Sequence, residues 1–105
     1  MEFRSIYATA GSVEEAQRIG RALVEERLVA CVNVLPGAIS LYRWDGAVQA
    51  EPEAVFFAKT TAERAPAAVA RIRTLHTYDV PCVLILPVEA GDPDYLRWIA
   101  AETQG

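Results

Sequence analysis

Residues 39–60 read ISLYRWDGAVQAEPEAVFFAKT, and they contain the strongest turn signal in the chain. Asp45-Gly46 at its centre is a strong hairpin signal, because a type I′ turn needs positive φ at both central residues. The flanking residues, 39–44 and 47–60, are rich in β-branched and aromatic side chains and predict two paired strands. Each arm is long for a small domain, so we expect a hairpin that extends beyond its own sheet and needs a partner there.

Prolines fall within both strands of this hairpin. The first strand begins near residue 29, and Pro36-Gly37 divides it into two segments, 29–35 and 39–44. Proline cannot donate a ladder hydrogen bond, so a bend or bulge is predicted there rather than the end of the strand. By the same reasoning, Pro52 places its part of the returning arm at a sheet edge or at a second bulge.

The rest of the chain alternates strand and helix signals. Three helices are predicted from capping signals at their N-termini. Ser12 and Glu15 form a capping box for a helix at 12–27, Thr60 and Glu63 form one for a helix at 62–75, and Asp92 caps a helix at 94–102. In a capping box, the hydroxyl and the carboxylate satisfy free N–H groups of the first turn. Outside the hairpin, strands are expected at 3–9 and 83–88, and the second of these is expected to be buried on both faces.

The predicted order is therefore strand, helix, two hairpin strands, helix, strand and a final helix. This βαββαβ order with a C-terminal addition indicates an α+β, ferredoxin-like fold, formed as a single domain by residues 1–105. The helices would cover one face of an antiparallel sheet. The other face, which carries Val55 and Phe57, would need another cover, and a trimer packed sheet to sheet is one solution.

Composition and charge exclude several classes of protein. The net charge is −4 and there is no basic stripe, so a nucleic-acid partner is not expected. No apolar run approaches the ~20 residues of a membrane span, and the N-terminus lacks the apolar core of a signal peptide. Cys31 and Cys82 make no disulfide framework and are expected in the core, with no flanking Lys or second His in the sequence to activate them. We expect a cytoplasmic protein with reduced thiols.

Four stretches together resemble the CutA family of divalent-cation tolerance proteins: ACVNVLPGAISLYRWDG (30–46), the Lys59-Thr60 pair, the H-x-Y-D-x-P motif (76–81) and GDPDYLRWI (91–99). They occur in the order and at the spacing of that family, over nearly the whole chain. The resemblance implies a ferredoxin-like protomer, a PII-like homotrimer, and a response to metal ions with copper or other divalent-cation binding. It implies no catalytic activity, so we expect a protein that is not an enzyme.

His76 is the only histidine and the first candidate for a metal ligand. Where copper binding is attributed to the family, the resemblance implies a first-strand cysteine and two adjacent histidines as ligands. The corresponding positions here are Ala8, Leu75 and His76, so only His76 is kept and any copper binding is expected to be weak. The alternative is that His76 ends a helix, where a partial positive charge is favourable.

A second candidate is a pocket for a ligand between subunits. Lys59 is expected at the end of a strand beside a helix N-terminus, which would make a corner that attracts anions. Members of the expected pocket are Lys59, Glu53, Tyr42, Trp44 and Tyr78. The pocket would take a small anionic or metal-bound ligand. In the alternative interpretation, Lys59 and Glu53 form a structural salt bridge and the aromatic side chains hold a trimer together.

Two other functions are considered for the same fold. A PII-like signalling or scaffold trimer would bind a small metabolite in the intersubunit clefts and would depend on Lys59 and the aromatic residues. A hydrolase on the same frame, in the manner of acylphosphatases, is disfavoured because the only asparagine, Asn33, lies within a strand run and no arginine–asparagine phosphate cradle is evident.

Overall fold

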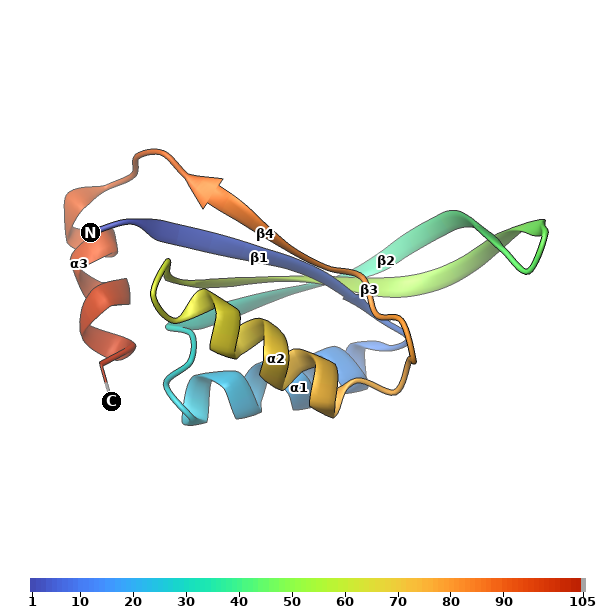
Figure 1. Ribbon diagram of the computed structural model, residues 1–105, viewed down its shortest axis with the longest axis horizontal. Helices are drawn as coiled ribbons and strands as arrows, with labels where there is room; N and C mark the ends of the chain where they lie inside the picture. The colour runs from blue at the N-terminus through green and yellow to red at the C-terminus, as the bar shows by residue number, and fades with distance from the viewer. Residues whose placement is uncertain (105) are drawn as a thin grey trace.

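The computed structural model describes residues 1–104 as a four-stranded antiparallel sheet with three helices. In chain order the elements are β1 (Phe3–Ala10), α1 (Val13–Glu25), β2 (Cys31–Trp44), β3 (Ala47–Thr61), α2 (Ala65–Leu75), β4 (Val83–Val88) and α3 (Pro93–Glu102). The strand order in the sheet is β2-β3-β1-β4 (Figure 1). This confirms the ferredoxin-like α+β fold with an additional C-terminal helix.

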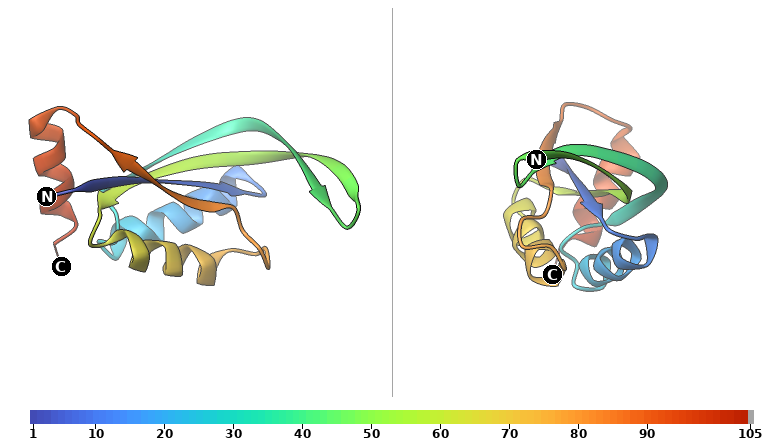
Figure 2. Two further views of the ribbon diagram at one scale, coloured as in Figure 1. Left: turned by 45° about the horizontal axis from the view of Figure 1, so that its top comes forward. Right: turned by 90° about the vertical axis from the view of Figure 1, so that its right-hand side faces the viewer.

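The core lies between one face of the sheet and the two helices α1 and α2, which Figure 2 shows on the same side. Alternate residues of the central strands point into it, because side chains alternate along a strand. Its buried members are Ile6, Ala8, Ala10, Ala54, Phe56 and Ala58 from the sheet, Ala16, Ile19, Leu23, Ala65, Ala68 and Ile72 from the helices, and Val29 between α1 and β2. Gly20 lets α1 approach β2, since a Cβ there would lie 3.1 Å from Val32 Cγ1.

The hairpin has the predicted turn and the predicted bulge. Asp45 and Gly46 have φ values of 53° and 78°, and the register of β2 against β3 shifts between Leu35 and Ala38. The sheet partner β1 pairs only with Ala54–Thr61 of β3. The rest of the hairpin therefore projects as an arm beyond the sheet, at the end opposite α3 (Figure 1), and gives the molecule extents of 44 × 25 × 21 Å.

The sheet face turned away from α1 and α2 is called here the helix-free face. Strand register assigns to it Phe3, Ser5, Tyr7, Thr9, Cys31, Asn33, Leu35, Val55, Phe57, Lys59, Thr61, Leu84, Leu86 and Val88. Val55 and Phe57 lie there as expected, and Lys59 is the only charged residue among these positions. Within a single chain the expectation that 83–88 is buried on both faces is wrong, because β4 is an edge strand and Leu84 is 55% exposed.

Two of the three capping predictions are confirmed and one is wrong. Ser12 accepts from Glu15 N and Asp92 accepts from Tyr95 N, each at the start of its helix. Thr60 instead stays in β3, where its buried hydroxyl donates to Leu28 O at 2.7 Å. Because Thr60 is used in this way, α2 begins three residues later than predicted, with no side-chain cap.

No helix within residues 1–104 is both long enough and apolar enough to cross a membrane.

Candidate functional site

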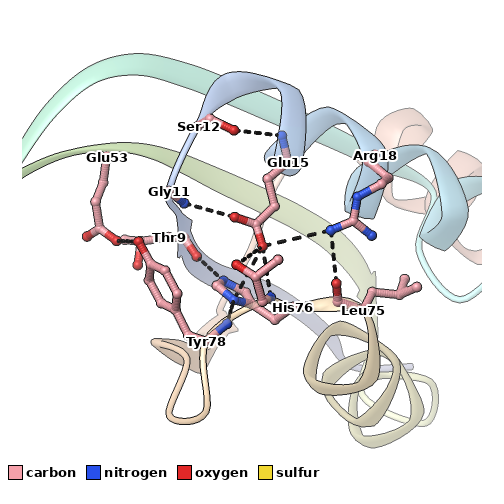
Figure 3. A network of polar contacts seen from close by, with 10 residues as sticks. Thr9, Gly11, Ser12, Glu15, Arg18, Glu53, Leu75, His76 and Tyr78 are labelled. Atoms are coloured by element: carbon pink, nitrogen blue, oxygen red, sulfur yellow. Dashed lines mark hydrogen bonds and ion pairs between the residues drawn. The ribbon is translucent and has the colours of Figure 1, made fainter.

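Three chain segments meet at one end of the two long helices, and their polar groups form the network drawn in Figure 3. The end of β1 leads into the start of α1 through Gly11 and Ser12, and the end of α2 lies beside this junction. The segment after α2, which holds His76 and Tyr78, therefore closes against the N-terminus of α1. This is where the H-x-Y-D-x-P motif lies in the fold.

Glu15 joins the loop after α2 to the first turn of α1. One carboxylate oxygen accepts from Gly11 N at 3.1 Å, and the other accepts from Thr77 N at 3.0 Å and from Thr77 Oγ1 at 2.9 Å. Burial alone would raise the pKa of Glu15, but the hydrogen bonds from Thr77 and Gly11 outweigh it and lower this pKa below its ordinary value. The charged carboxylate is thus built into the fold.

The His76 ring is fully buried, and both of its nitrogens contact backbone groups. Nε2 lies 2.7 Å from Thr9 O, and Nδ1 accepts from Tyr78 N at 3.1 Å. A carbonyl oxygen can only accept and a backbone N–H can only donate, so these contacts select the neutral ring with its proton on Nε2. His76 is also the C-cap residue of α2, as the alternative interpretation of the sequence expected.

Tyr78 extends the network to the hairpin. Its hydroxyl donates to Glu53 Oε2 at 3.0 Å, and its ring lies 4.7 Å from the His76 ring, centre to centre. The pKa of Tyr78 is raised to about 12. Burial is the largest cause, and the hydrogen bond to Glu53 and the negative charge of Glu53 add to it. A Cβ at position 11 would come within 3.1 Å of the Tyr78 hydroxyl, so Gly11 leaves room for this contact.

Lys59 lies apart from this network. The prediction of a corner beside a helix N-terminus is wrong, because strand alternation turns Lys59 to the helix-free face, away from α2. Its ammonium donates to Asn33 Oδ1 and not to Glu53. Glu53 is six residues away along β3, about 20 Å at the rise of a strand, and is bonded to Tyr78 instead. A salt bridge between Lys59 and Glu53 within one chain is therefore also excluded.

Tyr42 and Trp44 are in the projecting arm, opposite Gln49 and Ala47. Gln49 is ten residues from Lys59 along β3, or about 33 Å. A single chain therefore brings together Glu53, Tyr78 and His76, but it does not bring Lys59 or Trp44 to them. A pocket that joins all of the predicted residues would need more than one copy of the chain.

Several functional groups were not found from the sequence. The sequence predicts the capping role of Glu15, but nothing in it indicates the hydrogen bonds that Thr77 donates to this carboxylate. No Lys flanks either cysteine along the chain, but Lys59 lies directly opposite Cys31 in the β2–β3 ladder. Cys31 is partly exposed and Cys82 is exposed, against the expectation that both lie in the core. Strand register decides these neighbours, and no local sequence signal reveals it.

Within residues 1–104, no three His, Cys, Asp or Glu side chains are grouped closely enough to hold a metal ion. Structural zinc sites, for comparison, have four protein ligands, and catalytic ones three. His76 as a metal ligand stays a prediction, and its two ring nitrogens are already engaged in this structure.

Comparisons with known proteins agree on one family. The family model described as CutA1 divalent ion tolerance protein matches residues 4–102. The divalent-cation tolerance protein CutA of Thermus thermophilus is 43% identical over 98 residues, which cover 93% of this chain and 95% of that protein. Its counterpart from Pectobacterium atrosepticum is 42% identical over 96 residues, 91% of this chain and 87% of that protein.

Solved structures agree in the same way. The crystal structure of CutA from Xylella fastidiosa has a TM-score of 0.96 at 39% identity and covers 99% of this chain and 100% of that chain. The divalent cation tolerance protein of Thermus thermophilus has a TM-score of 0.93 at 41% identity and covers 97% and 99%. The resemblance read from the sequence motifs is confirmed, and the chain belongs to the CutA1 divalent ion tolerance protein family.

Proposed function

We propose that this chain acts in divalent-cation tolerance as a non-catalytic homotrimer. The observation that carries the assembly is the helix-free face, a mostly apolar sheet surface with a single charge, which α3 covers only in part, through Tyr95 at Cys31. The projecting arm adds further exposed apolar side chains, with Ile39 67% and Leu41 73% exposed. Surfaces of this size and composition mark interaction sites, and a chain of 105 residues gains much stability from burying them.

The geometry of the sheet favours contacts between copies of the chain. Its two edge strands, β2 and β4, have unpaired backbone groups along their outer sides. The edge of β4 on one copy can pair with the edge of β2 on the next, and such head-to-tail contacts close into a ring. Three copies is the number that the family resemblance implies.

The non-catalytic part is supported by the surroundings of His76. Its ring contacts the backbone groups of Thr9 and Tyr78 and not the side chain of a nucleophile. A histidine that acts as a general base needs to reach the proton it removes. The cytoplasm is the proposed compartment, because Cys31 and Cys82 are both free thiols and disulfides are rare there.

Copper or another divalent cation is the metal in this proposed role, and its fit to the chain is poor. Residues 1–104 supply no group of three ligands, and His76 becomes available only after its bonds to Thr9 and Tyr78 break. The residues of one chain therefore do not fit a tight copper site. We assign the cation a weak interaction, with His76 as the one imidazole to test.

Light scattering coupled to size exclusion tests the assembly. The wild-type protein should have the mass of three 11.5 kDa chains, about 34.5 kDa. Leu84→Glu places a charge on the helix-free face and should give the mass of a single chain. Ala70→Glu adds the same charge on an exposed position of α2 and should leave the trimer intact. A wild-type mass of one chain at micromolar concentration would contradict the assembly.

A calorimetric titration with Cu(II) at neutral pH tests the metal part. His76→Gln is the informative variant, because an amide can still donate to Thr9 O. Saturable binding by wild type that the variant loses would make His76 a ligand. Isotherms that are the same for both proteins, or flat for both, would remove His76 from the metal-binding residues.

A second candidate function is that of a PII-like trimer that binds a small anionic ligand between subunits. The observation that favours it is Lys59, a cation on the helix-free face with no carboxylate partner among residues 1–104. Lys59→Met should abolish ligand binding in this case, whereas cation binding should be unaffected.

A further inference from the structure

Lys59 is an isolated positive charge on an apolar surface. Its neighbours on the helix-free face are Ser5 on β1 and Cys31 on β2, each directly opposite in the ladder. Directly opposite side chains have Cβ atoms about 5 Å apart, so both polar groups lie within reach of a ligand held at the ammonium. Phe57 and Tyr7 follow in the next row, with their rings in edge-to-face contact.

The polar groups around this charge are neutral and can all donate a hydrogen bond. Asn33 accepts from the ammonium through Oδ1, and its amide nitrogen keeps two N–H donors. Ser5 has a hydroxyl, and the Cys31 thiol lies 3.1 Å from the Tyr95 hydroxyl. Within the described residues no carboxylate forms an ion pair with Lys59. A cation that is surrounded by hydrogen-bond donors and has no carboxylate beside it has the chemistry of an anion-binding site.

We propose that Lys59, Asn33 and Ser5 form a binding site for one oxyanion group, a carboxylate or a phosphate. This deepens the second candidate function and rests in part on the proposed assembly. When another copy covers the helix-free face, Lys59 leaves water, and an unpaired ammonium in that position is strongly unfavourable. An oxyanion removes this penalty because it supplies the missing negative charge and accepts from the surrounding donors.

The oxyanion has two possible sources. One is a small free anion that enters the site from solution. The other is a glutamate from the arm of a second copy, where Glu51 and Glu53 precede Lys59 in β3 and lie on the same side of the strand. Glu51 is exposed and lies opposite Ser40 in the projecting arm. Both sources present the same chemistry to Lys59, and the experiment separates them.

The first part of the experiment measures binding of inorganic phosphate by calorimetry at constant ionic strength, with chloride as the reference salt. Wild type should bind phosphate saturably, and Lys59→Met should bind about tenfold more weakly or not at all, the factor expected for loss of one charge-assisted hydrogen bond. Arg97→Met is the control, because it removes an exposed cation on α3, and its binding should match that of wild type. This result assigns the site to a free anion.

The second part of the experiment is carried out if the wild-type protein does not bind phosphate. Dissociation of the assembly is then measured for Lys59→Met, Glu51→Gln and Glu53→Gln, and for each Lys–Glu double variant. Non-additive effects between Lys59 and one glutamate would assign the oxyanion to the second copy. Absence of phosphate binding together with additive effects would overturn the site. Phosphate binding by a protein that light scattering finds monomeric would uphold the site and contradict the homotrimer.

Discussion

The network around His76 and the surface around Lys59 differ in whether their polar groups find partners within the chain. At the network, the carboxylate of Glu15 and both ring nitrogens of His76 find partners within the same chain. At Lys59, a full charge has only the oxygen of one amide. The first region satisfies its polar groups within a single chain, whereas Lys59 has no carboxylate partner among residues 1–104. The histidine that draws attention in the sequence therefore holds the protomer together, while the lysine is the group available to a partner.

Replacing His76 should have the largest effect on stability. His76→Ala leaves the buried Thr9 O and the partly buried Tyr78 N without their partner and opens a cavity, so we expect a loss of about 3 kcal/mol in the free energy of unfolding. Urea denaturation monitored by circular dichroism measures it. His76→Gln, which keeps a donor toward Thr9, should lose less. A loss below about 0.5 kcal/mol for the alanine variant would mean that the network is not structural.

The effect of Glu15 should depend on pH. Glu15→Gln should cost about 1–2 kcal/mol at pH 7, because hydrogen bonds to a charged group are replaced by weaker ones. The folded pKa of Glu15 lies below its ordinary value of 4.5, so the carboxylate stabilises the fold above pH 4.5 and this contribution is lost as the pH falls through the folded pKa. The difference between the two proteins should shrink from pH 5 to pH 3. A constant difference would contradict the role of the charge.

Tyr78→Phe removes one hydroxyl and should cost about 1 kcal/mol, the net value of its hydrogen bond to Glu53. Tyr42→Phe makes the same chemical change in the projecting arm, at a hydroxyl for which the structure gives no hydrogen bond within residues 1–104, and should be neutral. Thermal unfolding of the two variants side by side gives the comparison. Equal losses would show that the contact with Glu53 contributes nothing specific.

The smallest effect is expected beside Lys59. Asn33→Ala, made in the Leu84→Glu background that is expected to be a single chain, removes an exposed amide, and surface changes of this kind alter the free energy of unfolding by less than about 0.5 kcal/mol. Denaturation in chloride buffer without phosphate or carboxylate salts measures this. A loss comparable to that of His76→Ala would erase the contrast between the two regions.

The sequence predicts the parts of the fold that depend on neighbouring residues. The turn at Asp45-Gly46, the bulge after Leu35 and the caps at Ser12 and Asp92 each follow from local backbone chemistry. Thr60 matches the same local rule and fails, because its hydroxyl finds Leu28 O, 32 residues away. A long-range partner outweighs the capping preference there.

The candidate site is less predictable for the same reason. His76 attracts notice as the only histidine, but its partners at positions 9 and 15 are distant in sequence and depend on how α1 and α2 pack. Lys59 does not lie beside α2 as the sequence predicts, because its neighbours are set by the register of three strands. Residue type indicated which side chains matter, and only the tertiary structure gave their partners.

The bulge in β2 sets the direction of the projecting arm, whereas the cross-strand pairs of the arm do not depend on it. Two residues of β2, Pro36 and Gly37, lie opposite one residue of β3, and beyond them the pairing runs from Ala38–Glu53 to Trp44–Ala47 without a break. A bulge bends its strand and increases the twist. Deleting Gly37 would therefore straighten the arm and leave each cross-strand pair as it is. Protein engineers thus have a joint at which the aim of the hairpin can be changed while its sequence of contacts is kept.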